Sequence, residues 1–591
     1  MPPGPGGAAA AQAAGAANSP AGEAVPPARD AVPSATGAPA PSGEGAAVPA
    51  AVAVPAGAGR SRAGGWAAPG AARYAPVIIA AATMAVLGLW GLARDSSMGN
   101  DEVATRWAAL LPLRQLAHLL NTVDAVHGFY YLLMHAWVVV GSSPAVLRIP
   151  SVLAMIVAVA LTVILAQRLT GSGWSGLFAG LVMALTPVIT FYTQTARSYA
   201  MVVACVVAST LALLSALKAE AAGATGARAA RRWALYAALV IIGGYLNEMS
   251  LLVLAAHAVT VLLARYGLRV LGHWAAAAAT AAVLVLPLVV ISNREQGAVQ
   301  WITRPGLTDL KILFHDYFGA TTVVAVLLLA CAVVALLPPA GWWRRRSGAG
   351  AQTGPVAEPG AGAEEETPWW RAGGVSLPSV AVPLLVIPAG LLLAEALVAH
   401  PLYVDRYVLY GEVGAALLAG AGMYRIGQWL ADAANRRALV WVPGVVLCVL
   451  TLVLQLGPQH RIRTPQSRAY DFGGPSRFVG AHAHTGDGVL FFGTLFRKAR
   501  LGYPQDFTKT SDFAMAVSPR QAGTFRGVDK PFTLIAPLMR EHERIWVIGA
   551  EPSVHLPPGS YRAQSLELQD DFSRVLLRRY RGMIVTLWVR R

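Results

Sequence analysis

Charged side chains are scarce in this sequence. Of its 591 residues only 13% are charged, whereas 55% are hydrophobic. A soluble globular protein carries about 25% charged residues. So little charge over so long a chain excludes an ordinary soluble enzyme and predicts that a lipid bilayer surrounds most of the protein.

Lysine is the rarer of the two basic residues, with five of the 47 basic side chains, and the formal net charge is +16. In a soluble protein such an excess could indicate binding to nucleic acid. In a membrane protein it is the ordinary consequence of basic cytoplasmic loops. We therefore predict a lipid bilayer, and no nucleic acid, as the partner of these residues.

Cysteine is nearly absent. Cys205, Cys331 and Cys448 each lie in an apolar run, and no two of them have the spacing of a zinc ligand pair or a redox motif. We interpret them as small buried hydrophobic residues and predict no disulfide.

Large apolar side chains are scarce in residues 1–72, which are mainly Ala, Gly, Pro and Ser. Such a segment cannot bury enough surface to offset its ordering entropy. It also lacks the layout of a signal peptide, so we predict a disordered cytoplasmic tail. Residues 339–377, rich in Gly, Ala, Pro and Glu, are predicted to be a flexible cytoplasmic insert.

Long apolar runs occupy most of the remaining chain. A membrane span needs about 20 predominantly apolar residues. One further run, 129–141, is ambiguous. The predicted spans are 76–93, 149–167, 173–191, 199–217, 233–246, 250–264, 274–292, 320–338, 378–398, 408–424 and 438–456.

The basic loops determine the predicted orientation. Arginines cluster at 228–232, 265–269, 344–346 and 425–437. These clusters fall on one side only if run 129–141 does not cross, and the positive-inside rule makes that side cytoplasmic. We therefore predict a juxtamembrane or re-entrant helix at 129–141. The resulting topology is a multi-pass plasma-membrane protein with a cytoplasmic N-terminus and an extracytoplasmic C-terminus.

Residues 457–591 have ordinary polarity. Short apolar runs at 488–492, 544–549 and 583–589 predict buried strands, and 474–484 predicts a helix. The segment is therefore predicted to form a small extracytoplasmic α/β domain.

Two adjacent carboxylates, Asp101 and Glu102, lie in the first outer loop, 94–148, just beyond the first predicted span. They could begin a solvated loop or stabilise the first turn of a helix. They could also act as a general base, because a positioned carboxylate can remove a proton from an acceptor hydroxyl.

The same loop contains Asp124, His127 and Tyr131. A spacing of three can place Asp124 and His127 on one helix face, where they could form either a structural hydrogen bond or part of a site. Arg148 enters the next span and could extend to the interface. Glu248 occupies a short outer turn, where an ionisable group is either functional or simply solubilising.

Two arginines lie on the outer side, against the positive-inside bias. Arg197 is in a turn before Tyr199, and Arg406 lies between Asp405 and Tyr407. Each could pair with an acidic residue or bind a phosphate group. The topology brings carboxylates, a histidine and two arginines to one face, while a Gly-rich phosphate loop, a Ser-His-Asp arrangement and a zinc signature are all missing. This set favours glycosyl transfer from a lipid phosphate.

The order of these motifs resembles the family 39 and related membrane glycosyltransferases of the GT-C fold, which include the protein O-mannosyltransferases and the lipid A aminoarabinose transferase. In the family, His127 would be followed by Pro-Pro, and Thr195 is often Glu. The matching segments, which span about 76–456, are Asp101-Glu102, His127-Gly-Phe-Tyr-Tyr131, Arg148-Ile-Pro150, Ala196-Arg197-Ser198-Tyr199 and Arg406-Tyr407.

The resemblance implies an α-helical polytopic GT-C-like membrane protein of about eleven spans with juxtamembrane helices, residues 73–456 forming the catalytic module. It implies a polyprenyl-phosphate-linked hexose as donor, with mannose as a candidate, and a glycan, lipid or protein acceptor. It leaves a divalent metal open, because some members use one and others do not. It implies that Asp101 acts as the base or positions the acceptor, and that Arg406 lies near the carrier phosphate. From the residues and the resemblance together, we predict as catalytic residues Asp101 and Glu102, as donor-binding residues Arg197, Arg406 and Tyr407, and as acceptor-binding or site-shaping residues Asp124, His127, Tyr131, Arg148, Tyr199 and Glu248.

Two other classes of protein remain open from the sequence. A polymerase or ligase of lipid-linked polysaccharide would share the membrane and the carrier, but would place its acceptor-activating residues in late outer loops. A transporter or flippase would show broken spans in symmetric halves with charges at mid-membrane. The sequence shows no internal repeat, and its charges cluster at the outer ends of the spans.

Overall fold

The computed structural model describes most of the hydrophobic region and the C-terminal region. The predicted tail and most of the predicted insert lie outside the described residues. Those described are 74–93, 97–298, 302–337, 374–550 and 560–591.

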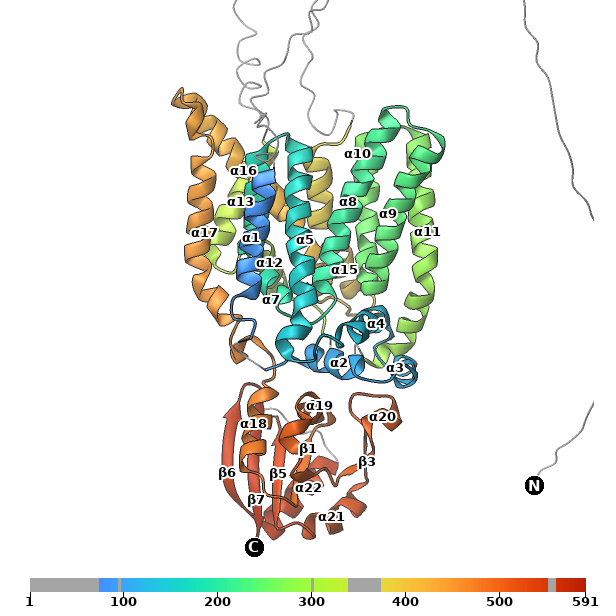
Figure 1. The fold of residues 1–591 in the computed structure, drawn as a ribbon, viewed down its shortest axis with the longest axis vertical. Helices are drawn as coiled ribbons and strands as arrows, with labels where there is room; N and C mark the ends of the chain where they lie inside the picture. Colours follow the sequence, from blue (N-terminus) through green and yellow to red (C-terminus); the bar gives the residue numbers. More distant parts are fainter. Residues whose placement is uncertain (1–73, 94–96, 299–301, 338–373, 551–559) are drawn as a thin grey trace, which may run out of the picture. The chain divides into compact units, whose positions relative to one another are not determined.

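Each of the eleven predicted apolar runs is helical, and Figure 1 shows these helices together as one bundle. Run 173–191 is divided between two helices. The bundle helices are α1 (Ala75–Leu89), α5 (Pro144–Thr170), α6 (Gly173–Leu185), α7 (Pro187–Thr193), α8 (Tyr199–Ala221), α9 (Gly226–Leu246), α10 (Val253–Ala264), α11 (Leu268–Ser292), α12 (Leu307–Phe318), α13 (Thr322–Leu336), α15 (Leu377–Val398), α16 (Glu412–Ala433) and α17 (Val442–Arg461).

Fewer helices than predicted are long and apolar enough to cross a membrane on their own. In the described part of the chain these are α5, α8, α11, α15 and α17. The pairs α6–α7 and α12–α13 each bend by 68°, and counting each pair as one span gives seven. Both bends have a backbone cause: Pro187 follows an extended Thr186, and Gly319 between α12 and α13 has φ +117°. Helices α1 and α10, with 15 and 12 residues, are shorter than a full span.

Small residues allow α16 to pack tightly between its neighbours. A Cβ atom on Gly420 would lie 2.3 Å from the backbone nitrogen of Ala179 in α6. A Cβ atom on Gly422 would lie 1.8 Å from the carbonyl oxygen of Cys331 in α13. Close backbone approach of this kind is a common way for helices to associate in lipid.

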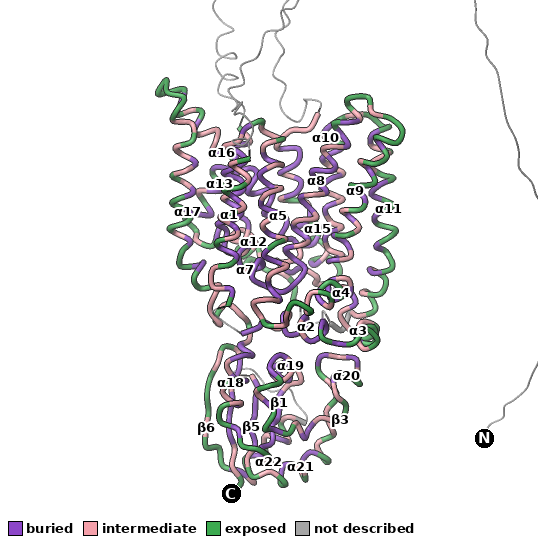
Figure 2. Tube along the Cα trace, viewed as in Figure 1, coloured by how far each residue is buried: buried purple, intermediate pink, exposed green. Residues whose placement is uncertain are grey.

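Burial distinguishes central from peripheral helices (Figure 2). In the most apolar stretch of α8 67% of the residues are buried, whereas in α11 and in α17 the share is 22%. Helix α8 is therefore central, and the exposed apolar faces of α11 and α17 are suited to lipid contact.

The ambiguous run 129–141 forms α4 (Gly128–Trp137), a helix of 10 residues. Its length of about 15 Å is half the thickness of a bilayer core. The helix is therefore too short to cross the bilayer, as predicted, and its juxtamembrane position stays a prediction. With α2 (Asn100–Ala109), α3 (Leu113–Leu120) and η2 (Ala125–His127), it lies at the end of the bundle nearest the C-terminal sheet (Figure 1).

The C-terminal region forms a five-stranded sheet in the order β2-β1-β5-β7-β6. Strand β1 pairs in parallel with β2 and β5, and the β5–β7 and β7–β6 pairs are antiparallel. A two-stranded ladder, β3 with β4, accompanies it. The strands are β1 (Asp487–Phe492), β2 (Thr510–Ser511), β3 (Met515–Val517), β4 (Val528–Asp529), β5 (Arg544–Gly549), β6 (Phe572–Tyr580) and β7 (Met583–Arg590).

The three predicted strands are confirmed as β1, β5 and β7, and predicted helix 474–484 is α18 (Gly473–His482). Strand β6 was missed. It is an edge strand whose residues are mostly exposed, and Arg574, Arg578 and Arg579 interrupt the apolar alternation that identifies a strand.

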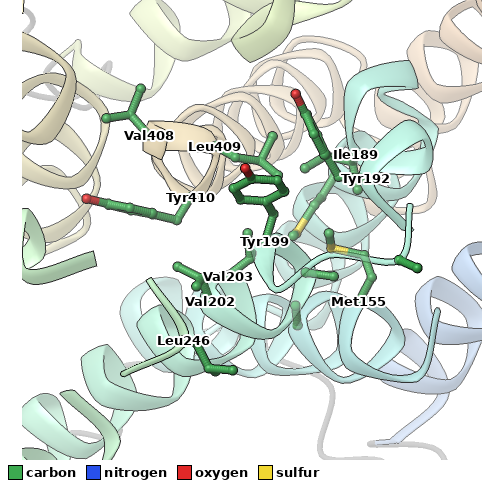
Figure 3. Packing of buried hydrophobic residues seen from close by; sticks show 14 of the residues in the cluster. Met155, Ile189, Tyr192, Tyr199, Val202, Val203, Leu246, Val408, Leu409 and Tyr410 are labelled. Carbon is green, nitrogen blue, oxygen red and sulfur yellow. The ribbon is translucent and has the colours of Figure 1, made fainter. Parts of the chain in front are cut away.

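An aromatic cluster supports the end of the bundle where α8 begins (Figure 3). Tyr192 of α7 and Tyr199 of α8 meet edge to face, with ring centroids 5.3 Å apart. Met155 of α5 and Leu409 of η5 (Asp405–Gly411) belong to the same buried cluster. The cluster therefore joins helix α8 to the segment that contains Arg406.

Candidate active site

Asp101 and Glu102 lie in the first turn of α2. The backbone N–H of Gly99 donates to Glu102 Oε2 at 2.9 Å, which forms a capping interaction at the start of the helix. Negative side chains in a first turn are favoured by the helix dipole, so both carboxylates have a local structural reason to be there.

Glu102 is bound on both carboxylate oxygens. Arg148 donates from Nε to Oε1 at 2.7 Å and from Nη2 to Oε2 at 3.0 Å. Arg468 approaches Oε2 at 3.3 Å, and the Ala196 N–H donates to Oε1 at 3.1 Å. Burial raises the pKa of Glu102, but Arg148 and Arg468 outweigh that and leave it at about 2. These donors occupy both carboxylate oxygens, so we propose a structural role for Glu102, which was expected to be catalytic, and a site-shaping role for Arg148.

Asp101 has a different environment. Its side chain is 31% exposed, and its carboxylate lies 4.0 Å from Arg197 Nη2. Burial raises the pKa of Asp101, yet the cations of Arg197, Arg406 and Lys498 lower it well below the usual range. Asp101 is therefore an ionised carboxylate that a ligand can reach, surrounded by three cations from separate parts of the chain.

Arg197 is held by the loop that follows α3. Its Nη1 donates to Tyr131 Oη at 2.7 Å, its Nη2 lies 3.5 Å from Asp124 Oδ2, and Tyr131 donates to the same Asp124 oxygen. Asp124 has φ +63°, the left-handed region that Asp tolerates better than most residues. The structure thus brings Asp124, Tyr131 and Arg197 together beside Asp101.

His127 is buried next to this group. Burial and the nearby Arg197 lower its pKa to about 3, so the imidazole is neutral. Its Nδ1 has no hydrogen-bond partner among the described residues. The Asp124 side chain bonds to Tyr131 and Arg197, and the hydrogen bond between Asp124 and His127 is a backbone one, from the His127 N–H to the Asp124 carbonyl at 2.9 Å.

Arg406 comes from η5. Its Nε donates to Tyr199 Oη at 2.9 Å, and its guanidinium lies 5.6 Å from the ring centre of Tyr407. The aromatic cluster of Figure 3 holds Tyr199 in turn. Tyr199 and Tyr407 therefore orient Arg406, which brings Tyr199, predicted as an acceptor-binding or site-shaping residue, next to two predicted donor-binding residues.

Glu248 falls outside this group. It begins η3 (Glu248–Leu252), and its carboxylate accepts a hydrogen bond from Ser292 at 2.7 Å. Among the described residues no hydrogen bond or ion pair joins it to Asp101, Asp124 or Arg197. The carboxylate that does contact the loop is Glu295, which accepts from the Ala125 N–H at 3.1 Å.

Sequence reasoning missed Lys498, the first residue of α19 (Lys498–Gly502) in the sheet domain. Its Nζ donates to Asn100 Oδ1 at 2.8 Å, directly beside Asp101 in the chain. The sequence offered one weak signal: lysine is rare in this arginine-rich protein. A residue almost 400 positions away could be assigned to the site only from the fold.

Within the described residues no group of three or more His, Cys, Asp or Glu side chains is arranged to hold a metal ion. His482, His484 and Asp487 of the sheet domain hydrogen-bond to other protein groups. Asp487 Oδ2 accepts hydrogen bonds from the Trp546 indole and the His484 backbone N–H.

No protein-family model matches the sequence, and no curated protein does. Solved structures do match. ArnT from Cupriavidus metallidurans, crystallised with undecaprenyl phosphate, has a TM-score of 0.50 and 14% identity, over 86% of this chain and 97% of ArnT. The archaeal oligosaccharyltransferase AglB from Archaeoglobus fulgidus, in complex with an inhibitory peptide and a dolichol-phosphate, has a TM-score of 0.42 and 11% identity, over 87% of this chain and 74% of AglB. Both neighbours have the GT-C fold, and the similarity to ArnT shows that this chain has it too.

Proposed function

We propose that this chain, which has the GT-C fold, is a membrane glycosyltransferase that moves a sugar from a polyprenyl-phosphate carrier to an acceptor hydroxyl. The observation that carries the proposal is Asp101, an ionised and partly exposed carboxylate beside Arg197 and Arg406. A hexose such as mannose as the sugar, and a glycan, lipid or protein outside the cell as the acceptor, belong to the same proposal.

The proposed reaction needs a base and a stabilised leaving group. Asp101 accepts the proton of the acceptor hydroxyl, and the hydroxyl oxygen forms a bond to the anomeric carbon of the sugar. The bond between that carbon and the phosphate oxygen breaks, and the electron pair leaves with the carrier phosphate. A phosphodiester with one negative charge becomes a phosphomonoester with two, so cations fixed at the leaving group favour the transition state.

The two arginines differ in what they are able to do. Arg197 is already engaged by Asp124 and Tyr131, so we assign it to positioning Asp101 and the loop. Arg406 is oriented by the hydroxyl of Tyr199 and the ring of Tyr407. We assign Arg406 to the carrier phosphate, which guanidinium groups bind bidentately.

The likeness to ArnT supports a lipid phosphate as the carrier, since the ArnT crystal contained undecaprenyl phosphate. The proposal for this chain itself depends on the geometry around Asp101.

The test is sugar transfer by the full-length protein reconstituted in lipid vesicles. Radiolabelled undecaprenyl-phosphate hexoses serve as donors, and a cell-envelope extract serves as acceptor. Asp101→Asn should lower transfer about 100-fold or more, as expected for loss of a general base. Asp570→Asn, at an exposed position of the sheet domain, is the matched control and should transfer normally.

Two results would contradict the proposal. Normal sugar transfer by a correctly inserted Asp101→Asn variant would show that Asp101 is not the base. Movement of the carrier lipid across the bilayer by the wild type, without transfer of any sugar, would point to a flippase instead.

A further inference from the structure

Lys498 comes from the sheet domain, and it is one of the cations that lower the pKa of Asp101. It lies at the start of α19 with 7% of its surface exposed, and its Nζ donates to Asn100 Oδ1 at 2.8 Å. Asn100 precedes Asp101 in the first turn of α2. A lysine from the C-terminal domain thus contacts the helix turn that bears Asp101.

The ammonium group of Lys498 has more hydrogen-bond donors than partners. It has three N–H groups, and in the described part of the chain Asn100 is its only hydrogen-bond acceptor. The face of Phe525 lies 5.0 Å from Nζ, which stabilises the charge without accepting a conventional hydrogen bond. A buried charged donor that lacks acceptors is costly, so the arrangement indicates a missing acceptor.

The charged groups that face Lys498 come from several elements. Asp101 and Asp124 attract it, while Arg197 and Arg526 repel it. Both carboxylates lie beyond ion-pair distance, since no described acidic group lies within 4.0 Å of Nζ. Neither carboxylate therefore neutralises Lys498 by direct contact.

Several hydrogen bonds fix this position. Tyr503 Oη accepts from the Met98 N–H at 2.7 Å, and Arg106 Nη1 donates to the Gly502 carbonyl at 3.1 Å. Both partners lie on or next to α19. The helix that bears Lys498 is therefore held against the first outer loop, as a binding group needs to be.

We propose that Lys498 binds the phosphate group of the carrier lipid, so that the sheet domain completes the donor site. This inference rests on the proposed function. Phosphate oxygens accept hydrogen bonds from the two remaining N–H groups. The compact ammonium of Lys498 can bind the same phosphate that the planar guanidinium of Arg406 binds. Lys498 is a binding residue in this scheme and does not take part in proton transfer.

The binding has a predicted pH dependence. Burial lowers the pKa of Lys498 to about 8, with Asp101 and Asp124 opposing the shift and Arg197 and Arg526 adding to it. The amine therefore loses its proton as the pH rises from 7.5 to 9.5. A phosphomonoester, with a second pKa of about 6, does not titrate in that interval, so the change reports the lysine.

The experiment measures equilibrium binding of radiolabelled undecaprenyl phosphate to the full-length protein in nanodiscs. Lys498→Met should weaken binding about 10-fold or more at pH 7.5, the loss expected for a charge-assisted hydrogen bond. Lys498→Arg should restore most of it. Wild-type affinity should fall between pH 7.5 and 9.5, whereas Lys498→Arg should show no fall. Lys509→Met, an exposed lysine of the same domain, is the control and should bind as the wild type does.

Two further ligands identify what is recognised. Undecaprenol, which lacks the phosphate, should bind all variants equally, and an equal loss in Lys498→Met would show a purely structural role and overturn the proposal. Inorganic phosphate should compete weakly with the lipid in the wild type. Lys498-dependent binding of inorganic phosphate without any effect on the lipid would show that the site takes free phosphate, which also overturns it.

The outcomes separate this inference from the proposed function. Lys498-dependent lipid binding without any sugar transfer contradicts the function and leaves the inference standing. Sugar transfer with lipid binding that ignores Lys498 contradicts the inference alone. If Lys498→Met does not fold, a wild-type affinity that stays constant from pH 7.5 to 9.5 is sufficient to reject it.

Discussion

Arg148 holds Glu102 by both carboxylate oxygens, with donor–acceptor distances of 2.7 and 3.0 Å. This ion pair joins the first turn of α2 to the start of α5 and leaves the adjacent Asp101 facing the cations of the site. We therefore propose that the two neighbouring carboxylates differ in role, with Glu102 fixing the helix and Asp101 available to a ligand.

Removal of the Glu102 carboxylate should destabilise the protein. Glu102→Ala leaves the buried Arg148 and the partly buried Arg468 without their carboxylate partner, at a cost of about 3–5 kcal/mol. Thermal unfolding in detergent should show a large fall in Tm for this variant. Asp101→Asn, at a partly exposed position, should keep a Tm near that of the wild type and lose transfer activity instead.

The control for that comparison is Glu541→Ala, an exposed glutamate in the sheet domain, which should change neither property. A stable Glu102→Ala with impaired transfer would reverse the two assignments and make Glu102 the functional carboxylate.

The difference between Asp101 and Glu102 could not be predicted from the sequence alone. Apolar runs predicted the bundle helices because lipid demands long apolar segments, and the ten-residue α4 followed from the charge pattern. The only local difference described between Asp101 and Glu102 is the capping bond from Gly99 to Glu102, and the rest is made by Arg148 and Arg468, which lie far along the chain. Lys498 was missed for the same reason, since only the packing of α19 on α2 brings it to Asn100.

The pH dependence of transfer should be flat on the acidic side. The pKa of Asp101 lies below its ordinary value, so its ionised form is fully present at pH 5 and above. Burial lowers the pKa of His127 to about 3, so His127 is neutral over the same range. We expect kcat/KM for the donor to be constant from pH 5 to 7 and to decline as Lys498 loses its proton near pH 8.

The profile of His127→Asn is the matched measurement. Its shape should equal that of the wild type even if its height is lower. An acidic limb near pH 6.5 in the wild type that disappears in His127→Asn would show that the imidazole titrates during catalysis, contrary to its buried environment.

A substitution of Arg406 that keeps its positive charge should still weaken binding of the lipid-linked donor. Arg406→Lys loses the planar group that stacks on Tyr407 and donates to Tyr199. We expect KM for the lipid-linked donor to rise about 10-fold, because lysine cannot reproduce a bidentate contact. Tyr199→Phe keeps the guanidinium and should have a smaller effect. Arg520→Lys, exposed in the sheet domain, serves as the control; a KM in Arg406→Lys equal to that of this control would remove Arg406 from the donor site.

The side of the membrane that carries Asp101 can be tested by labelling. The basic loop between α8 and α9 is predicted to be cytoplasmic, and the sheet domain, which contacts the Asp101 loop through Lys498 and Asn100, is predicted to be outside. Gln569→Cys, exposed in the sheet domain, should react with a membrane-impermeant maleimide in intact cells, whereas Thr225→Cys in the basic loop should react only after permeabilisation. The wild type provides the background, since its cysteines lie within the apolar helices α8, α13 and α17. Labelling of Thr225→Cys in intact cells would place the Asp101 site in the cytoplasm, where the acceptor would have to be an intracellular molecule and the proposed envelope acceptor would be wrong.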